Sequence, residues 1–154
     1  MLRDRFPTPR LPMPQQRTYL HPTEEAGRAF FGRASGESIV MLNLLRFRDV
    51  ADYSQTPALQ PETPISGQEA YRRYMDHTRP HLAASGGEIL FFGRGGDFLI
   101  GPSDERWDAV MLVRQASARA FLAYASNEQY LDGMGHRLAA LADSRLLPLV
   151  PEAA

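Results

Sequence analysis

The chain of 154 residues contains no cysteine and no lysine. Without cysteine there is no disulfide, no thiolate nucleophile and no cysteine-ligated zinc or iron–sulfur site. Without lysine a Schiff base cannot form, which excludes the usual pyridoxal-phosphate chemistry and makes all 17 basic residues arginines. The absence of cysteine is typical of a protein in a reducing cytoplasm, where we expect this one to be located.

Strong charge and long apolar runs are also missing. The net charge is −1, so no electrostatic field favours nucleic acid or an anionic membrane. No apolar run is long enough to span a bilayer, and the basic first residues are not followed by the apolar core of a secretory signal. With 44% hydrophobic and 23% charged residues, the composition is that of a soluble globular protein. We expect neither nucleic-acid nor membrane partners.

Residues 1–21 are rich in proline and carry scattered charges, which predicts an extended N-terminal arm. Such an arm is either disordered or lies across a partner subunit, and the sequence favours neither. Residues 22–150 are long enough for a single domain with a sizeable core.

The first half of this domain alternates helical and strand patterns. A short helix is predicted within 22–35, with Thr23 as its N-cap. Residues 36–47 form a strand that is apolar on both faces, which is typical of a central strand. A loop with three prolines follows over 51–65, and a capping box from Ser66 to Glu69 begins a helix that Pro80 is expected to kink.

The second half begins with a strand over 88–101, bent by its glycines, and a strand over 106–115. Ser117 caps a helix that should turn Phe121, Leu122 and Ala125 inward. A second capping box from Ser126 to Gln129 predicts a separate helix to about residue 134. A short helix over 135–143 and a last apolar run over 144–150 complete the chain.

This order of elements predicts an α+β fold, in which helices cover one face of an antiparallel sheet. The other sheet face is also apolar, so a second layer must cover it. An identical sheet from another copy is the simplest cover for so short a chain. We therefore expect a homodimer whose two sheets enclose an interior space.

The order and spacing of several short motifs resemble the family known as domain of unknown function 1330, within the ferredoxin-like superfamily of dimeric α-β barrels. The motifs that carry the resemblance are Met41–Phe47, Gly67–Tyr74, Gly86–Gly87, Trp107–Asp108, Tyr130, His136–Arg137 and Asp143–Leu146. The resemblance implies a cleft between sheet and helices in each subunit. Relatives in the superfamily include monooxygenases, isomerases, haem proteins and stress-response proteins, so it implies no single chemistry.

Asn43 and Arg46 interrupt the first strand and project to opposite faces by simple alternation. A polar group in a buried strand needs a partner. One interpretation is that Asn43 orients a ligand carbonyl or hydroxyl and Arg46 binds a carboxylate. The other is that Asn43 bonds to nearby backbone and Arg46 pairs with an acid near the strand end.

His77 and His81 stand four residues apart, which places both on one helix face. A metal site would need a third ligand, and none is indicated, so no metal is expected. His81 is instead a candidate proton carrier near Tyr74, whose hydroxyl either lines the cleft or is a core group bonded to backbone.

The densest polar cluster predicted lies near the C-terminus and contains Tyr130, His136, Arg137, Asp143 and Ser144. A helix start and the neighbouring Arg137 would lower the pKa of His136, so that a neutral imidazole could act as a general base. Asp143 would orient it from one helical repeat away, while Tyr130 and Arg137 bind substrate. The alternative is a capped, salt-bridged helix end. No nucleophile elbow surrounds Ser144, so a serine-hydrolase triad is not indicated.

The segment Phe92–Asp97 (FGRGGD) has glycines without the lysine and the strand-to-helix context of a phosphate loop. Bend glycines explain it better, although Arg94 is still a candidate to reach into the cleft.

Three functions remain open at this point. The first is a cofactor-free oxygenase or isomerase acting on a small organic acid or phenol-like metabolite. The second is a non-catalytic ligand-binding or stress-response protein. The third is a structural homodimer whose cleft its own side chains fill.

Overall fold

The computed structural model describes residues 17–32 and 36–153. The first 16 residues of the expected Pro-rich arm thus lie outside the described residues. The elements are α1 (Glu24–Gly32), β1 (Ile39–Phe47), a 3₁₀ turn η1 (Pro57–Leu59), α2 (Gly67–Ala84), β2 (Glu88–Asp97), β3 (Arg106–Gln115), α3 (Ala118–Ala125), α4 (Glu128–Leu131), α5 (Met134–Ala140) and β4 (Leu141–Leu149). In the described ranges, no helix combines the length and apolarity needed to cross a membrane.

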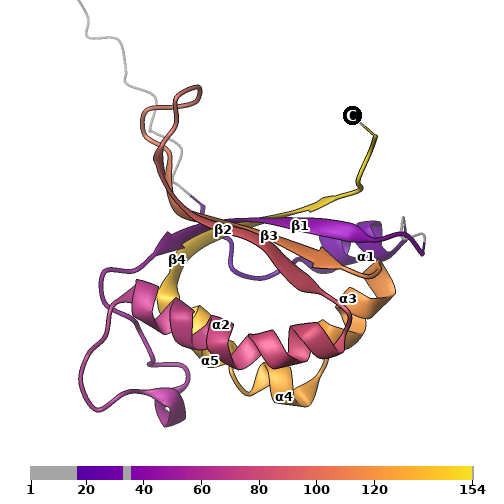
Figure 1. Ribbon diagram of the computed structural model, residues 1–154. Coiled ribbons are helices and arrows are strands. Elements are labelled where there is room, and N and C mark those ends of the chain that lie inside the picture. Colours follow the sequence, from indigo (N-terminus) through magenta and orange to yellow (C-terminus); the bar gives the residue numbers. More distant parts are fainter. Residues whose placement is uncertain (1–16, 33–35, 154) are drawn as a thin grey trace, which may run out of the picture.

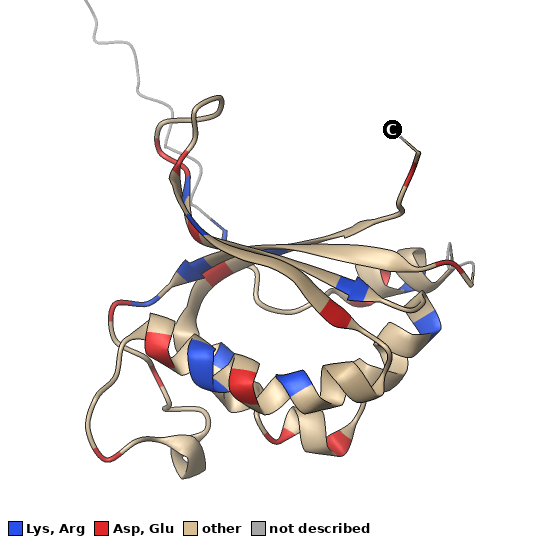
Figure 2. Ribbon diagram, viewed as in Figure 1, with Lys and Arg blue, Asp and Glu red and all other residues tan. Residues whose placement is uncertain are grey.

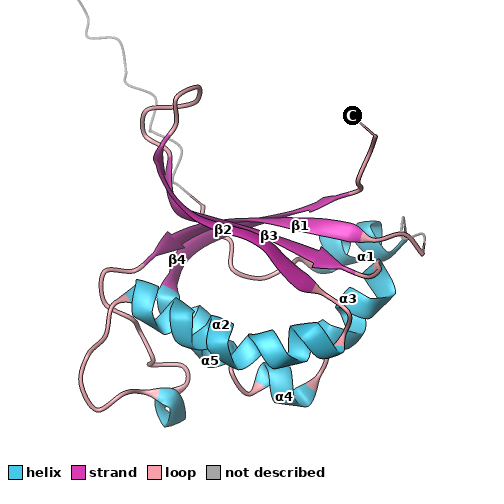
Figure 3. Cartoon of the chain, viewed as in Figure 1, coloured by secondary structure: helices cyan, strands magenta, loops and turns pink. Residues whose placement is uncertain are grey.

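The four strands form one antiparallel sheet in the order β2-β3-β1-β4. The helices lie on one face of this sheet, as Figures 1 and 3 show. This is the ferredoxin-like α+β arrangement, so the predicted fold class is confirmed. The buried core lies between the sheet and the helices. We call the other sheet face, which none of the described helices covers, the outer face.

Local signals in the sequence explain where the two best-defined helices begin. The hydroxyl of Ser66 accepts a hydrogen bond from the backbone N–H of Glu69 at 3.0 Å, which confirms the predicted N-cap of α2. Ser117 accepts from the N–H of Ala120 at 3.0 Å in the same way and begins α3. Helix α2 continues past Pro80 to Ala84.

Two predictions about α3 and α4 are wrong in detail. Leu122 is 46% exposed, while Tyr124 is buried in its place, because the inward face of α3 is rotated relative to the predicted one. The N-cap of α4 is Asn127, which accepts from the N–H of Tyr130, and not Ser126. Helix α4 ends at Leu131, shorter than predicted, and α5 begins at Met134.

The last strand begins three residues earlier than the sequence indicates. β4 starts at Leu141, which is fully buried, so Asp143 is a strand residue and not the end of a helix. Pairing of β4 with β1 supplies the backbone hydrogen bonds that a longer helix would otherwise make. This shift changes which way Asp143 points.

The free edge of β4 is partly covered by the segment just before α1. The N–H and the hydroxyl of Ser144 both donate to the carbonyl of Tyr19, at 3.1 and 2.6 Å. The N–H of Tyr19 donates in turn to Asp143 at 2.8 Å. Arg137 on α5 donates to the carbonyl of Leu20 at 2.8 Å. Residues 19 and 20 are therefore tied to the domain at its edge strand.

The outer face is apolar along its middle. Cross-strand partners project to the same side of a sheet, so the register identifies its members. These members are Val40, Leu42 and Leu44 on β1, Phe91 on β2, Val110 and Leu112 on β3, and Leu147 and Leu149 on β4. Phe91 is 55% and Leu147 is 54% exposed. The β2–β3 hairpin and the segment after β4 both rise on this side of the sheet (Figure 1).

Candidate functional site

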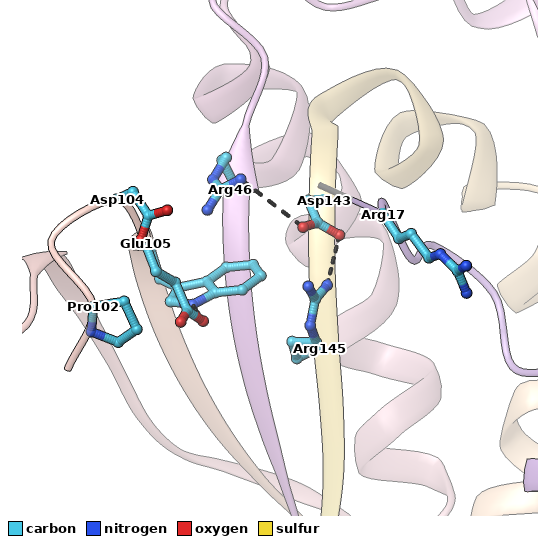
Figure 4. Close-up of a pocket in the computed structure, with 8 residues that line it drawn as sticks. Arg17, Arg46, Pro102, Asp104, Glu105, Asp143 and Arg145 are labelled. Atoms are coloured by element: carbon cyan, nitrogen blue, oxygen red, sulfur yellow. Dashed lines mark hydrogen bonds and ion pairs between the residues drawn. The ribbon is translucent and has the colours of Figure 1, made fainter. Parts of the chain in front are cut away.

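A polar pocket lies at one end of the outer face, at the base of the β2–β3 hairpin (Figure 4). Its volume is about 230 Å³. The residues that line it are Arg17, Arg46, Pro102, Asp104, Glu105, Trp107, Asp143 and Arg145. Figure 2 shows charges of both signs gathered around the base of the hairpin, while its tip carries none.

Strand register explains how this pocket is assembled. Arg46 on β1 is the register partner of Asp143 on β4, so both side chains project to the outer face. Arg145 lies two residues after Asp143 and therefore projects to the same side. Trp107, near the start of β3, completes this end of the sheet.

Asp143 is the anchor of the pocket. Its side chain is only 4% exposed, yet it is well supplied with donors. Oδ1 accepts from the Arg145 guanidinium at 2.7 Å, from the N–H of Tyr19 at 2.8 Å and from the N–H of Ser144 at 2.9 Å. Oδ2 lies 3.9 Å from the Arg46 guanidinium. A buried carboxylate with this many donors is held in a single orientation.

Two guanidinium groups stack on one indole ring in this pocket. The guanidinium carbon of Arg46 lies 4.9 Å, and that of Arg145 5.0 Å, from the ring centroid of Trp107. Arg46 also donates twice to the carbonyl of Arg106, at 2.8 and 3.2 Å. The indole N–H donates to Glu105 at 3.1 Å. Both cations are therefore held in fixed positions over an aromatic surface.

A second polar group lies on the helix side, where Tyr53 meets His136. The Tyr53 hydroxyl and Nδ1 of His136 are 2.8 Å apart. Burial is the main cause that lowers the pKa of His136, and the charge of Arg73 and the neighbouring His77 lower it further. The imidazole is thus biased towards its neutral form, in which Nδ1 accepts from the tyrosine hydroxyl when the proton is on Nε2.

Tyrosine side chains fill the space between sheet and helices. The hydroxyls of Tyr74 and Tyr130 are 2.8 Å apart, and the rings of Tyr124 and Tyr130 pack with centroids 4.4 Å apart. Burial raises the pKa of Tyr71, Tyr124 and Tyr130, so these phenols stay protonated. The resemblance implied a cleft here, but the space around these rings is occupied by core side chains.

Asn43 and Arg46 lie on opposite faces of β1, as simple alternation predicts. The Asn43 amide faces the helix side and donates to the backbone carbonyls of Met41 at 3.2 Å and Met111 at 3.4 Å. Of the two interpretations, the structure shows the one in which Asn43 bonds to backbone. Arg46 pairs with an acid near the strand end and also lines the pocket.

The expected arrangement of Asp143 beside His136 is not what the structure shows. Asp143 faces the outer side from β4, whereas His136 bonds to Tyr53 on the helix side. The direction of the His136 pKa shift agrees with the prediction, but the charge that contributes is that of Arg73 and not Arg137. Arg137 instead donates to Leu20 and, at 3.4 Å, to Ser144.

The two remaining predicted residues, His81 and Arg94, are separate from the pocket. The rings of His77 and His81 lie 5.3 Å apart, and Nε2 of His77 is 2.7 Å from the carbonyl of Gln129. Within residues 17–32 and 36–153, no three His, Asp or Glu side chains are grouped so as to hold a metal. Arg94 is exposed on the edge strand β2.

Sequence reasoning missed Trp107, Arg145 and Tyr53 as site residues. Trp107 is the one tryptophan of the chain and opens a strand, which was a usable signal. Arg145 follows Asp143 by two residues, a spacing that places both on one face of a strand but not of a helix. Because residues 135–143 were predicted to be helical, Asp143 and Arg145 were not predicted to lie on the same face. Tyr53 lies in the loop before α2 and is brought to His136 only by the tertiary fold.

Comparison with known proteins places the chain among uncharacterised relatives. No protein-family profile matches it, and no curated protein does. The structure of the RPA0582 protein of unknown function from Rhodopseudomonas palustris is 33% identical, with a TM-score of 0.79, over 90% of this chain and 100% of that chain. The methylated RPA0582 protein gives the same identity and TM-score over 88% of this chain and 96% of that one.

A dimeric ferredoxin-like protein of unknown function from Thermobifida fusca is 15% identical, with a TM-score of 0.45, over 76% of this chain and 93% of that chain. A similarity this distant transfers neither function nor assembly. The similarity to RPA0582 is much stronger, because a third of the residues are identical over nearly the whole of both chains. This chain belongs to the same family as the RPA0582 protein.

Proposed function

We propose that this protein is a homodimer that binds a small organic anion in the pocket at the base of the β2–β3 hairpin. The observation that carries the proposal is the pair of guanidinium groups, from Arg46 and Arg145, stacked on Trp107 and fixed by Asp143. We also infer that its family is the one named domain of unknown function 1330, from the order and spacing of the motifs described above.

The apolar outer face supports the homodimer. Leucine, valine and phenylalanine side chains from all four strands line it, and no helix from the described residues covers it. Burying apolar surface is favourable by roughly 25 cal/mol per Å². A second copy presents the same face, so an isologous pair covers both at once. Arg114 and Glu88, which form an ion pair of 2.8 Å, give this face a polar rim.

The chemistry of the pocket favours a planar carboxylate. A guanidinium recognises a carboxylate through two parallel hydrogen bonds, and the Arg145 side chain, which is 40% exposed, is accessible to such a ligand. The volume of about 230 Å³ is below the roughly 300–1,000 Å³ of pockets for drug-sized ligands. The ligand is therefore expected to be small, on the scale of a single ring with one acidic group.

Trp107 provides the test, because it is the chain's single tryptophan and lies against both arginines. Titration with benzoate should change its fluorescence in a saturable way, whereas benzyl alcohol, which has the same ring without the charge, should not. Arg145→Gln should weaken benzoate binding by about 1.5–3 kcal/mol, the value of a hydrogen bond to a charged group.

Arg72→Gln is the control, because Arg72 is an exposed arginine paired with Glu69 on α2, away from both the pocket and the outer face. Equal loss of binding in both variants would show a general charge effect and remove the pocket from the proposal. The absence of any benzoate response in the wild-type protein would also count against it.

Catalysis by His136 is a second candidate, favoured by its lowered pKa and its hydrogen bond to Tyr53. A neutral imidazole is suited to accept a proton near neutral pH, as an isomerase or a cofactor-free oxygenase requires. Native mass spectrometry of the purified protein would identify any small compound released on unfolding. His136→Ala should then abolish turnover of that compound while its binding changes little, and unchanged turnover would exclude this role.

A further inference from the structure

The tip of the β2–β3 hairpin presents three consecutive apolar side chains to solvent. Phe98 is 44%, Leu99 is 99% and Ile100 is 91% exposed. Single exposed apolar residues are ordinary on a protein surface, but a contiguous group at the end of a projecting element marks an interaction site.

The glycines of β2 bend this hairpin away from the plane of the sheet. A Cβ atom on Gly95 would collide with the carbonyl oxygen of Trp107, so only glycine permits this close approach of β2 to β3. Gly96 has a φ of +152°, which L side chains rarely adopt. The backbone is therefore shaped to direct the hairpin tip to the outer-face side (Figure 1).

From this direction we propose that the hairpin tip, residues 98–101, packs against a second copy of this chain. The inference rests on the homodimer proposed above and adds a second contact to it. In a two-fold pair with opposed outer faces, a hairpin that rises on the outer-face side runs alongside the other copy. The contact buries Leu99 and Ile100, which the single chain leaves in water.

The charges near the tip favour a protein partner over a lipid surface. The charged residues nearest the tip are Asp97, Asp104 and Glu105, and Arg94 and Arg106 lie further down the two strands, whereas elements that enter an anionic membrane carry basic residues beside their apolar ones. The pocket shares this hairpin, since Pro102 and Trp107 line it. Because the pocket lies at the outer face, a second copy opposed to that face also lies opposite the pocket.

The absence of cysteine makes a direct test possible, because Ile100→Cys introduces a single thiol at the tip. We expect this thiol to react with a maleimide at least about tenfold more slowly in the dimer than in a monomeric form of the same chain. Leu147→Asp, which places a charge in the middle of the outer face, supplies the monomer. Thr63→Cys, in the exposed loop before α2 on the helix side, is the control and should react equally fast in both forms.

Sedimentation velocity on the same variants distinguishes the two proposals. A wild-type protein that is monomeric at all concentrations would overturn the homodimer itself. A dimer that Leu147→Asp dissociates, but in which the thiol at the hairpin tip reacts as fast as in the monomer, would overturn the tip contact and leave the homodimer standing. Protection of the tip thiol by phosphatidylglycerol vesicles but not by dimer formation would identify a lipid partner and also overturn the tip contact.

Discussion

Arg46 and Asp143 are register partners on neighbouring strands, and their side chains meet on the uncovered face of the sheet. Their positions in the sequence do not predict this contact, because the two residues lie in opposite halves of the chain. The pairing of β1 with β4 brings a cation and a nearly buried anion together, and both residues line the polar pocket.

Removing the Asp143 carboxylate should be strongly destabilising. Asp143→Ala leaves the N–H of Tyr19 without its acceptor, and it removes one of the two acceptors of Arg145 and of the Ser144 N–H, which keep their bonds to the carbonyls of Ser144 and Tyr19. Because Arg46 and Arg145 are partly exposed, we expect a loss in the free energy of unfolding of about 1.5–3 kcal/mol, the value of hydrogen bonds to a charged group. Urea denaturation monitored by circular dichroism measures this.

Glu69→Ala is the control for Asp143→Ala, because it breaks only the exposed pair with Arg72 on α2. Exposed pairs contribute about 0–1 kcal/mol. Comparable losses in the two variants would mean that the Asp143 network contributes no more than a surface pair.

The stability of the protein should depend on pH through His136. Its pKa is lowered in the folded state, so the unfolded chain, with a value near 6.5, takes up the proton first. The contribution of the neutral imidazole is complete above about pH 6.5 and is lost progressively as the pH falls from there towards the folded pKa. The free energy of unfolding of His136→Gln should therefore fall less between about pH 7 and about pH 5 than that of the wild-type protein.

His81→Gln serves as the comparison for His136→Gln in this experiment. His81 lies in the last turn of α2, away from Tyr53. Its substitution should therefore leave the contribution of His136 to the pH dependence of stability unchanged. Identical pH profiles for the wild-type protein and His136→Gln would contradict the prediction.

The hydroxyls of Tyr74 and Tyr130 should be energetically coupled. Tyr130→Phe removes the partner that lies 2.8 Å from the buried Tyr74 hydroxyl, which keeps its contact with Tyr124, and should cost about 0.5–1.5 kcal/mol. Replacing both tyrosines by phenylalanine removes both polar groups, so the double variant should lose less stability than the sum of the single losses. A double-mutant cycle by thermal or urea unfolding measures the coupling. Strict additivity would show that the two hydroxyls do not depend on each other.

Gly67→Ala should destabilise the first turn of α2. A Cβ atom there would collide with the carbonyl oxygen of Arg48 and would lie 2.6 Å from that of Ala140, both of which are backbone atoms. Overpacking of this kind costs typically about 1–3 kcal/mol. Gly36→Ala is the matched control, because no atom lies within 4 Å of its added Cβ, and its melting temperature should stay near that of the wild type.

The sequence predicted the parts of the fold that depend on local chemistry. Ser66 and Ser117 begin their helices because a hydroxyl satisfies a free N–H in the first turn, and this signal lies within a single helical turn. The strand over 106–115 was predicted with the bounds it has in the structure, because a short apolar run over 109–113 is bounded on both sides by polar residues. The uncovered apolar sheet face followed from β1 being apolar on both sides.

The candidate site was predicted less well, because it depends on contacts between distant segments. The stretch around Leu141 has residues with high helix propensity, and pairing with β1 overrides that preference. Once Asp143 was assigned to a helix, neither its link to Arg46 nor the position of Arg145 could be derived. The pairing of Tyr53 with His136 joins a loop to α5 over 83 positions, which no local pattern encodes.

The backbone hydrogen bond between Tyr19 and Ser144 affects the tendency of the chain to aggregate at high concentration. β4 is an outermost strand, and an outermost strand with unpaired N–H and C=O groups can template the addition of further extended chains. The carbonyl of Tyr19 occupies one N–H of that edge, and Arg145 places a cation close by. Proteolytic removal of the residues up to Leu20 would reopen the edge, and the truncated chain would then be the form prone to polymerise into fibrils.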